Sequence, residues 1–443
     1  MQNQSENKMG VMPIGKLVLN MSLPMILSML VQAMYNIVDS IYVSRVSEAA
    51  LTAVSLSFPA QNLMIGLATG TAVGVNALLS RALGAGDRDR ANRVAENGVF
   101  LALVGYILFL LFGLFASEAF IAAQTSNAQI IGYGRDYLVV VCCYSFGLYG
   151  QVIFERLMQS TGRTIYTMYT QGIGAIINII LDPVFIFEKG NGIGLFGMGV
   201  KGAAVATVIG QIVAFIIAMV LNHRKNTDIR LKLREFRPDL KMIGRIYAIG
   251  VPSVIMMAIG SVMTFLMNKI LILYTTGKET AATVFGVYFK LNSFAFMPIF
   301  GLNNGVIPII AFNYGAQKRR RMTKAIKVSM CYALGFMLVG TIVFMTIPDV
   351  LLGLFQATDQ MLAIGVPALR IIGSTFLVAG VCIVLGSVFQ SLGFGVYSMI
   401  VSLARQLFVL VPAAWILARI VQQSGNDMLV WFSFPVAEIV SAA

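Results

Sequence analysis

The stretch GAIINIILDPVFIF, residues Gly174–Phe187, places one carboxylate inside an almost purely apolar segment. Asp182 follows Asn178 by four residues, so on a helix both side chains project from the same face. An ionisable group at a bilayer centre costs roughly 2.5–3.5 kcal/mol on insertion scales, so it usually serves an ion, a proton or a substrate. The alternative is a local role for Asp182, as a helix cap or a hydrogen-bond partner, because Pro183 follows it directly.

The composition of the whole chain is typical of a membrane protein. Of its 443 residues, 58% are hydrophobic and 12% are charged, whereas soluble domains are ~45–50% apolar and ~25% charged. The chain contains about twelve apolar segments, each long enough to cross ~30 Å of hydrocarbon. These segments must be helical because lipid cannot satisfy backbone hydrogen bonds. We therefore predict an all-α polytopic membrane protein.

The net charge of +13 is concentrated in alternate loops. Basic residues cluster in Arg81–Arg93, Arg224–Arg245 and Lys318–Lys327, whereas Ser117–Gln129 and Pro348–Gln360 contain none. This distribution follows the positive-inside rule, so we expect a cytoplasmic N-terminus and a cytoplasmic central loop. It argues against nucleic-acid binding and for a multi-pass protein of the cell (inner) membrane.

The residues needed for metal or nucleophilic chemistry are missing from the sequence pattern. The first dozen residues are polar, which argues against a cleaved signal peptide and for insertion directed by the first span. The single histidine, His223, opens a basic loop. The cysteines fall inside apolar segments without metal spacing, at Cys142, Cys143, Cys331 and Cys382. We expect no enzyme activity, no cofactor and no transition-metal site.

The chain divides into two similar halves. We predict a cytoplasmic tail at 1–16, an N-lobe of six helices at 17–222, a basic linker at 223–242 and a C-lobe of six helices at 243–443. The expected spans are 17–44, 51–80, 95–116, 130–157, 165–187, 202–222, 243–274, 281–312, 325–347, 360–390, 395–418 and 428–443.

An internal repeat supports this division. Residues 231 positions apart pair Gly84 with Gly315, Ala85 with Ala316, Gly70 with Gly301 and Gly74 with Gly305. Pro24 and Pro252 pair at an offset smaller by three. Such short matches also arise by coincidence in apolar sequences, but these keep one order relative to the spans. Because six spans per half give both halves one orientation, we predict two lobes related by a pseudo-twofold along the membrane normal.

Four polar residues of the first half are expected at one depth in the membrane. At ~1.5 Å per residue, Asp39, Asp182 and Thr207 each lie roughly 9 Å from the outer end of their spans. Asn178 lies one turn deeper than Asp182. Oxygen ligands suit a hard monovalent cation or a proton, with Asp39, Asn178 and Asp182 as the candidate Na⁺ ligands. Alternatively, these residues only hydrogen-bond helices together, for ~0.6–2 kcal/mol each.

The second half places different charges near the midplane. Arg370, Arg405 and Glu438 each lie about eleven residues, or roughly 16 Å, from an outer loop, and Lys290 lies slightly shallower. We interpret them as a salt-bridge network around Glu438, because lone buried cations are costly. The functional alternative is a basic patch for anionic substrate groups, or a gating switch. Glu155 and Arg156 are interpreted as a snorkelling pair at the inner boundary.

With these residues identified, the chain resembles the multidrug and toxic compound extrusion (MATE) transporters over nearly its whole length. The segments that carry the resemblance are SLPMILSMLVQAMYNIVDSIYVSRV (Ser22–Val46), GAGD (Gly84–Asp87), QSTGRT (Gln159–Thr164), INIILDPVFIF (Ile177–Phe187) and GVKGAAVATVIGQ (Gly199–Gln211). The combination and order of these segments are specific, whereas most of them would be weak signals alone.

The resemblance implies twelve helices in two lobes around a V-shaped cavity, and drug export driven by sodium or proton entry. By motif, the family's N-lobe cation site falls on Asp39, Asn178, Asp182 and Thr207, and its bend in the first helix falls on Pro24. The seventh span contains no Glu and the tenth no Asp, which argues against the C-lobe cation site of one family branch.

We therefore predict a cation-coupled secondary antiporter that exports amphipathic or cationic drugs by alternating access. Its coupling ion would be Na⁺ or H⁺, its partners small drug-like substrates and membrane lipid, and its expected state a monomer. The alternative is a flippase or exporter for a lipid-linked or anionic substrate, which the basic residues of the C-lobe would suit.

Overall fold

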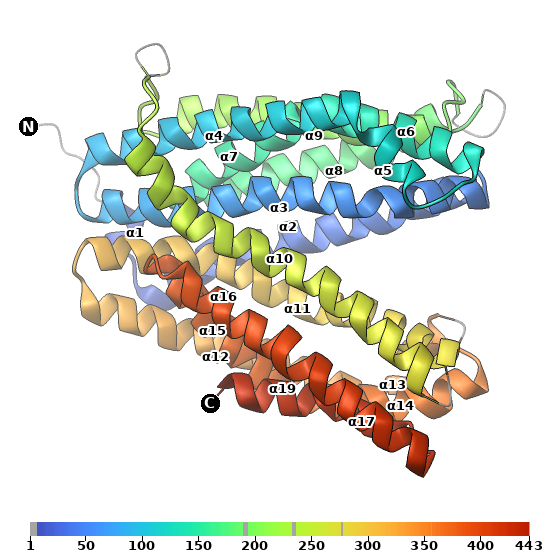
Figure 1. Ribbon diagram of the computed structural model, residues 1–443. Coiled ribbons are helices and arrows are strands. Elements are labelled where there is room, and N and C mark those ends of the chain that lie inside the picture. The colour runs from blue at the N-terminus through green and yellow to red at the C-terminus, as the bar shows by residue number, and fades with distance from the viewer. Residues whose placement is uncertain (1–6, 189–193, 233–235, 276–277, 356, 443) are drawn as a thin grey trace, which may run out of the picture.

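The computed structural model describes residues 7–188, 194–232, 236–275, 278–355 and 357–442, and within these ranges every regular element is a helix (Figure 1). Parts of the predicted tail and linker, Arg234 included, lie outside the described residues. The helices, in chain order, are α1 Lys8–Val11, α2 Ile14–Ser44, α3 Glu48–Gly84, α4 Arg88–Phe115, α5 Ser117–Ala122, α6 Ala128–Cys143, α7 Phe146–Ser160, α8 Thr164–Ile186, α9 Val200–Lys225, α10 Leu240–Tyr274, α11 Lys278–Gly315, α12 Arg319–Thr346, α13 Pro348–Gly353, α14 Asp359–Gly373, α15 Phe376–Ser391, α16 Gly395–Leu403, the π-helix η1 Ala404–Leu410, α17 Val411–Ser424, α18 Met428–Trp431 and α19 Ser433–Ala442.

The apolar helices account for the twelve predicted spans. Within the described ranges, nine helices or continuous helical stretches are long and apolar enough to cross a membrane. Two bent pairs, α6–α7 and α14–α15, bring the number to eleven when each pair counts as one span, and the shorter apolar segment Met428–Ala442 lies at the position of the twelfth predicted span. The chain is therefore an all-α polytopic membrane protein.

The predicted spans 130–157 and 360–390 are each formed by two helices with a bend between them. The break between α6 and α7 bends the axis by 44°, and the break between α14 and α15 bends it by 50°. At both breaks a hydroxyl donates to a backbone carbonyl of the preceding turn: Ser145 to Cys142 at 2.8 Å and Ser374 to Ile371 at 2.6 Å. Such bonds compete with the helical ladder for carbonyl acceptors.

The internal repeat is visible in the backbone. The two breaks lie at equivalent positions of the two halves, and so do two pairs of residues with positive φ. Gly162 (φ 85°) and Gly393 (φ 88°) are 231 residues apart, as are Gly86 (φ 75°) and Gln317 (φ 57°). A left-handed conformation at a glutamine costs about 1–2 kcal/mol, so the shared turn geometry holds even where the glycine is missing.

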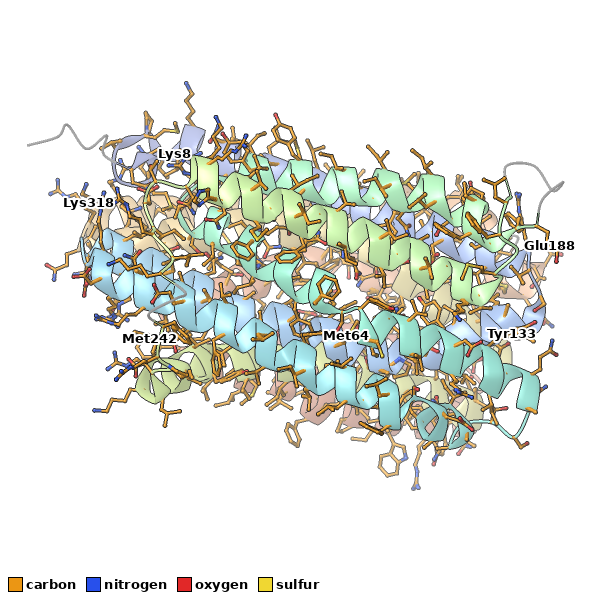
Figure 2. All side chains as sticks on the ribbon, turned by 90° about the horizontal axis from the view of Figure 1, so that it is seen from above. Lys8, Met64, Tyr133, Glu188, Met242 and Lys318 are labelled. Atoms are coloured by element: carbon orange, nitrogen blue, oxygen red, sulfur yellow. The ribbon has the colours of Figure 1, made fainter. Side chains whose placement is uncertain are left out.

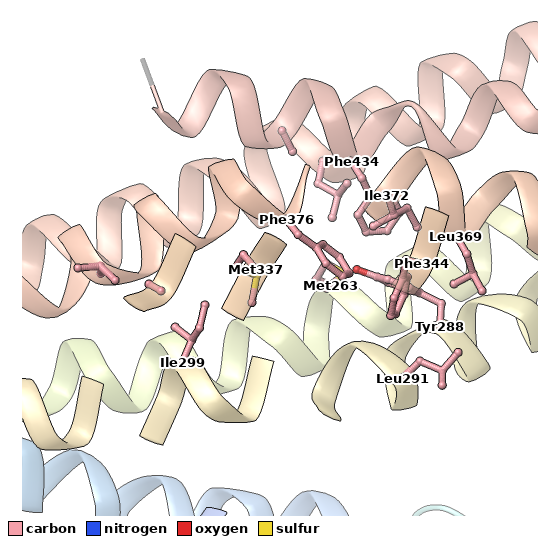
Figure 3. Close-up of a cluster of buried hydrophobic side chains, with 14 of the residues drawn as sticks. Met263, Tyr288, Leu291, Ile299, Met337, Phe344, Leu369, Ile372, Phe376 and Phe434 are labelled. Carbon is pink, nitrogen blue, oxygen red and sulfur yellow. The ribbon is translucent and has the colours of Figure 1, made fainter. Parts of the chain in front are cut away.

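Each lobe has its own hydrophobic core. One cluster of buried side chains contains residues between Val43 and Ile249. The other contains residues between Met263 and Ala437, including Phe344 and Phe376, whose rings meet edge to face (Figure 3). The first turns of α2 pack in the second cluster and the first turns of α10 in the first. The first helix of each lobe therefore begins inside the hydrophobic core of the other lobe.

The two lobes meet closely at one end of the molecule. Figure 2 shows Lys8, Met242 and Lys318 at this end, called the basic end below, and Tyr133 and Glu188 at the opposite end. The helix bundles approach each other at the basic end and diverge toward the opposite end (Figure 1). A Cβ on Gly84 would lie 1.9 Å from the Phe312 carbonyl oxygen, and one on Gly315 would lie 2.0 Å from that of Arg81. Only glycine permits this reciprocal contact.

Residues 7–12 also bridge the two lobes at the basic end. The Asn7 amide donates to the Thr161 carbonyl of the N-lobe at 3.1 Å. From the C-lobe, Lys318 donates to the Gly10 carbonyl at 3.1 Å and Arg321 to the Met12 carbonyl at 2.7 Å. These bonds hold the basic end closed across the lobe boundary.

Candidate functional site

Three of the four predicted N-lobe residues are joined by hydrogen bonds. The Asn178 amide on α8 donates to Asp182 Oδ1 at 3.4 Å and to Thr207 Oγ1 on α9 at 3.1 Å. Asp182 is fully buried and Asn178 is 3% exposed. Pro183 lies inside α8, so the acid belongs to the helix and does not cap its end.

Asp39 on α2 completes the set. It is partly buried, and it lies close enough to Asp182 for the two charges to interact. Within the described part of the chain, three buried oxygens of this set have no hydrogen-bond partner: Asp39 Oδ1, Asn178 Oδ1 and Asp182 Oδ2. Buried polar atoms are normally paired. Oxygen atoms of two acids and an amide that lack donors are suited to bind a proton or a hard monovalent cation.

Two tyrosines that the sequence analysis missed border this site. Tyr35 and Tyr137 both lie close enough to Asp39 and Asp182 to be influenced by their charges. The Tyr137 hydroxyl accepts a hydrogen bond from the Gln61 amide at 3.0 Å. Tyr35 precedes Asp39 by one helical turn, a spacing that is visible in the sequence. Tyr137 has no comparable sequence signal, because it lies on α6, whereas Asp39 lies on α2 and Asp182 on α8.

A glycine contact brings α9 against α8 beside the site. A Cβ on Gly210 would lie 2.7 Å from the Gly174 carbonyl oxygen and 3.4 Å from the Asn178 Cβ. Gly210 is three residues from Thr207, so the close approach sets how near the Thr207 hydroxyl comes to Asn178.

Gly210→Ala is therefore expected to separate the two helices and to destabilise the fold by about 1–3 kcal/mol, as overpacking does. The measurement is the thermal midpoint of the purified protein. Gly172→Ala on α8 is the matched control, because nothing lies within 4 Å of its Cβ position. Equal midpoints for the two variants would contradict the assignment.

A cavity extends from these residues toward the basic end. It encloses about 980 Å³ of empty space, part of it open to solvent, and its wall includes Asn178, Thr207, Glu155 and Arg156. The interpretation of Glu155 and Arg156 as a snorkelling surface pair was wrong. They are 3% and 9% exposed. Arg156 is covered by the other lobe, since its Nη1 donates to Asn304 Oδ1 of α11 at 3.0 Å, whereas Glu155 is covered by α8 of its own lobe, whose Thr170 and Gln171 donate to it.

The charged residues predicted near the C-lobe midplane do not form one network. Arg405, in η1, pairs with Glu438 of α19 at 3.3 Å, and both side chains are largely buried. Lys290 is exposed, with its Nζ 5.9 Å from the Phe355 ring centre. Arg370 is also exposed and has no ion pair among the described residues. The network around Glu438 is therefore a single pair.

Pro24 lies inside α2, where it removes the backbone donor that would bond to residue 20. The Ser28 hydroxyl donates to the Pro24 carbonyl at 2.9 Å. A bend of the helix at this point stays a prediction.

The chain matches known proteins over nearly its full length. The family model MatE matches residues 24–184 and 252–416. The multidrug export protein MepA of Staphylococcus saprophyticus is 25% identical over 430 residues, 97% of this chain and 92% of that protein. MepA of Staphylococcus haemolyticus is 26% identical with the same coverage. Among solved structures, the outward-facing conformation of a multidrug resistance MATE family transporter of the MOP superfamily shares the fold, with a TM-score of 0.91, 24% identity, and coverage of 100% of this chain and 96% of that one.

Proposed function

Because this chain belongs to the MatE family of membrane transporters, we propose that it is a secondary antiporter that exports amphipathic or cationic drugs in exchange for Na⁺ or H⁺. The observation that best supports ion coupling is that Asp39, Asn178 and Asp182 each have a buried oxygen without a hydrogen-bond donor. The relatives named as multidrug export proteins support the class of substrate. In this proposal the chain works as a monomer in the cell (inner) membrane, and the basic end is cytoplasmic.

The coupling ion would enter from the end opposite the basic end. Asp39, Asp182 and Thr207 come from α2, α8 and α9, so an ion bound among them pulls three helices of the N-lobe together. Asn178 and Thr207 also line the drug cavity. Ion binding and drug binding would therefore compete for one region, which is the differential affinity that exchange requires. Reopening at the basic end then releases the ion and admits the next drug.

The alternative, export of an anionic or lipid-linked substrate, has less support. Of the three basic C-lobe residues that suggested it, Arg405 is neutralised by Glu438, while Lys290 and Arg370 are exposed. The cavity near Asn178 carries unpaired acceptor oxygens, which repel anions, and Nη1 of its guanidinium, Arg156, already donates to Gln159 and Asn304.

The test is transport by the full chain in proteoliposomes loaded with a fluorescent cationic dye. An inward gradient of Na⁺ or of H⁺ is expected to accelerate dye efflux, and dissipating that gradient with an ionophore is expected to stop the acceleration. Dye efflux that is indifferent to both gradients would contradict ion coupling. Faster efflux of an anionic dye would favour the alternative.

A further inference from the structure

Glu155 on α7 is a buried acid that the coupling site does not use. Its carboxylate accepts three hydrogen bonds, all from neutral groups. The Gln151 amide donates to Oε1 at 3.0 Å, the Thr170 hydroxyl to Oε1 at 2.7 Å, and the Gln171 amide to Oε2 at 2.7 Å. A carboxylate offers about four acceptor positions, so one position on Oε2 is left.

No cationic side chain among the described residues pairs with this acid. Arg156 is adjacent in sequence, but its Nη1 donates to Gln159 Oε1 at 2.8 Å and to Asn304 Oδ1 at 3.0 Å. A carboxylate that is 3% exposed is costly to keep buried, and the nearby Arg156 charge, which attracts it without a direct ion-pair contact, offsets only part of that cost. A cation that enters the cavity would remove this cost.

Two further acceptors line the same cavity. Gln171 Oε1 on α8 and Gln211 Oε1 on α9 are buried and have no hydrogen-bond partner in the described part of the chain. Gln171 precedes Asn178 by seven residues, which is two helical turns or ~10.5 Å. Gln211 follows Thr207 by four residues, or one turn. The acceptors thus lie toward the basic end from the coupling residues, within one continuous cavity.

We propose that Glu155, Gln171 and Gln211 form a substrate subsite that selects organic cations carrying N–H donors, such as primary ammonium and amidinium groups, over quaternary ammonium groups. The selection follows from geometry. The remaining position on Glu155 and the two amide oxygens require hydrogen-bond donors, and a quaternary ammonium has none. An unmatched buried acceptor carries the cost of its own desolvation. This subsite rests on the proposed function as a drug exporter.

The test compares two dyes that share fluorophore and charge: dansylcadaverine, a primary ammonium, and its trimethylammonium derivative. Equilibrium binding to the purified full chain is followed by dansyl fluorescence. Glu155→Gln is expected to weaken binding of the primary ammonium about tenfold or more, the usual scale of a hydrogen bond to a charged group. Binding of the trimethylammonium dye should change less than about twofold by the same reasoning. Glu118→Gln, an exposed acid paired with Arg135, is the matched control.

Equal weakening of both dyes, or no weakening of either, would overturn the proposal. If Glu155→Gln is polydisperse on gel filtration, Gln211→Leu decides the question, with a several-fold loss expected for the primary ammonium alone and an equal loss for both dyes contradicting it. Because binding is measured without a gradient, failure of ion coupling is seen separately. In that case the wild-type chain still distinguishes the two dyes but shows no ion-driven efflux.

Discussion

Asp182→Asn and Asp39→Asn are each expected to reduce ion-driven dye efflux from proteoliposomes at least about tenfold, with the fold intact. Asparagine has the size of aspartate but can neither take up a proton nor carry the charge that holds a cation. Loss of one charge-assisted contact costs about 1.5–3 kcal/mol, and each 1.4 kcal/mol is about tenfold in affinity. Asp182 is fully buried, so its replacement has the larger effect.

Asp136→Asn is the matched control for both variants. Asp136 is an exposed acid on α6 of the same lobe, so its replacement should leave efflux within about twofold of the parent, as for most surface changes. Parent-like efflux by both Asp39→Asn and Asp182→Asn would show that these acids do not couple transport to an ion.

Gly84→Ala and Gly315→Ala are expected to open the basic end. The new Cβ atoms would lie 1.9 Å and 2.0 Å from carbonyl oxygens of the facing helix, far inside the ~3.5 Å at which non-bonded atoms attract. The lobes must separate there, at a cost of about 1–3 kcal/mol for each methyl group. A shift of about 2 kcal/mol changes the balance of two states roughly 30-fold. We therefore expect a marked loss of transport together with greater accessibility of the basic end.

The accessibility is measured by thiol labelling of a cysteine introduced at Met12, on the segment that bridges the lobes. The matched control is Gly132→Ala on α6, which has nothing within 4 Å of its Cβ position. Labelling and transport that match this control would mean that the glycine contacts do not hold the lobes together.

The sequence was sufficient to predict the parts of the fold that depend on hydrophobicity and periodicity. That pattern predicts the twelve apolar segments, the 231-residue repeat and the two-lobe architecture. The segments are helical because lipid cannot hydrogen-bond their backbone groups. Asn178, Asp182 and Thr207 could be grouped because helix rise converts position into depth. The hydrogen bonds among them depend on the glycine contact at Gly210, whose partner helix the sequence alone does not reveal.

The errors arose where individual contacts, between helices or within one turn, decide the structure against the overall hydrophobic pattern. Glu155 and Arg156 were placed at a membrane surface because depth arithmetic does not include the helices that cover them. These are α8, whose Thr170 and Gln171 bond to Glu155, and α11 of the other lobe, whose Asn304 bonds to Arg156. The breaks at Ser145 and Ser374 were missed because hydroxyl bonds to the preceding turn are compatible with an unbroken apolar run.

The two lobes differ chemically at equivalent positions. Glu438 lies 231 residues after Thr207, and each bonds across to the preceding apolar helix, Glu438 to Arg405 and Thr207 to Asn178. In the C-lobe the acid is therefore paired with a guanidinium, whereas in the N-lobe Asp39, Asn178 and Asp182 have oxygens without hydrogen-bond donors. This difference agrees with a single coupling site in the N-lobe.

The most direct test of ion exchange reverses the driving force. Proteoliposomes containing the full chain are loaded with cationic dye at equal Na⁺ and equal pH on both sides, and uptake of ²²Na⁺ and internal pH are followed as dye leaves. The account predicts that dye exit drives Na⁺ or H⁺ inward through the wild-type chain, and that Asp182→Asn abolishes this uptake. Dye exit through the wild-type chain with no accompanying movement of either ion would contradict it.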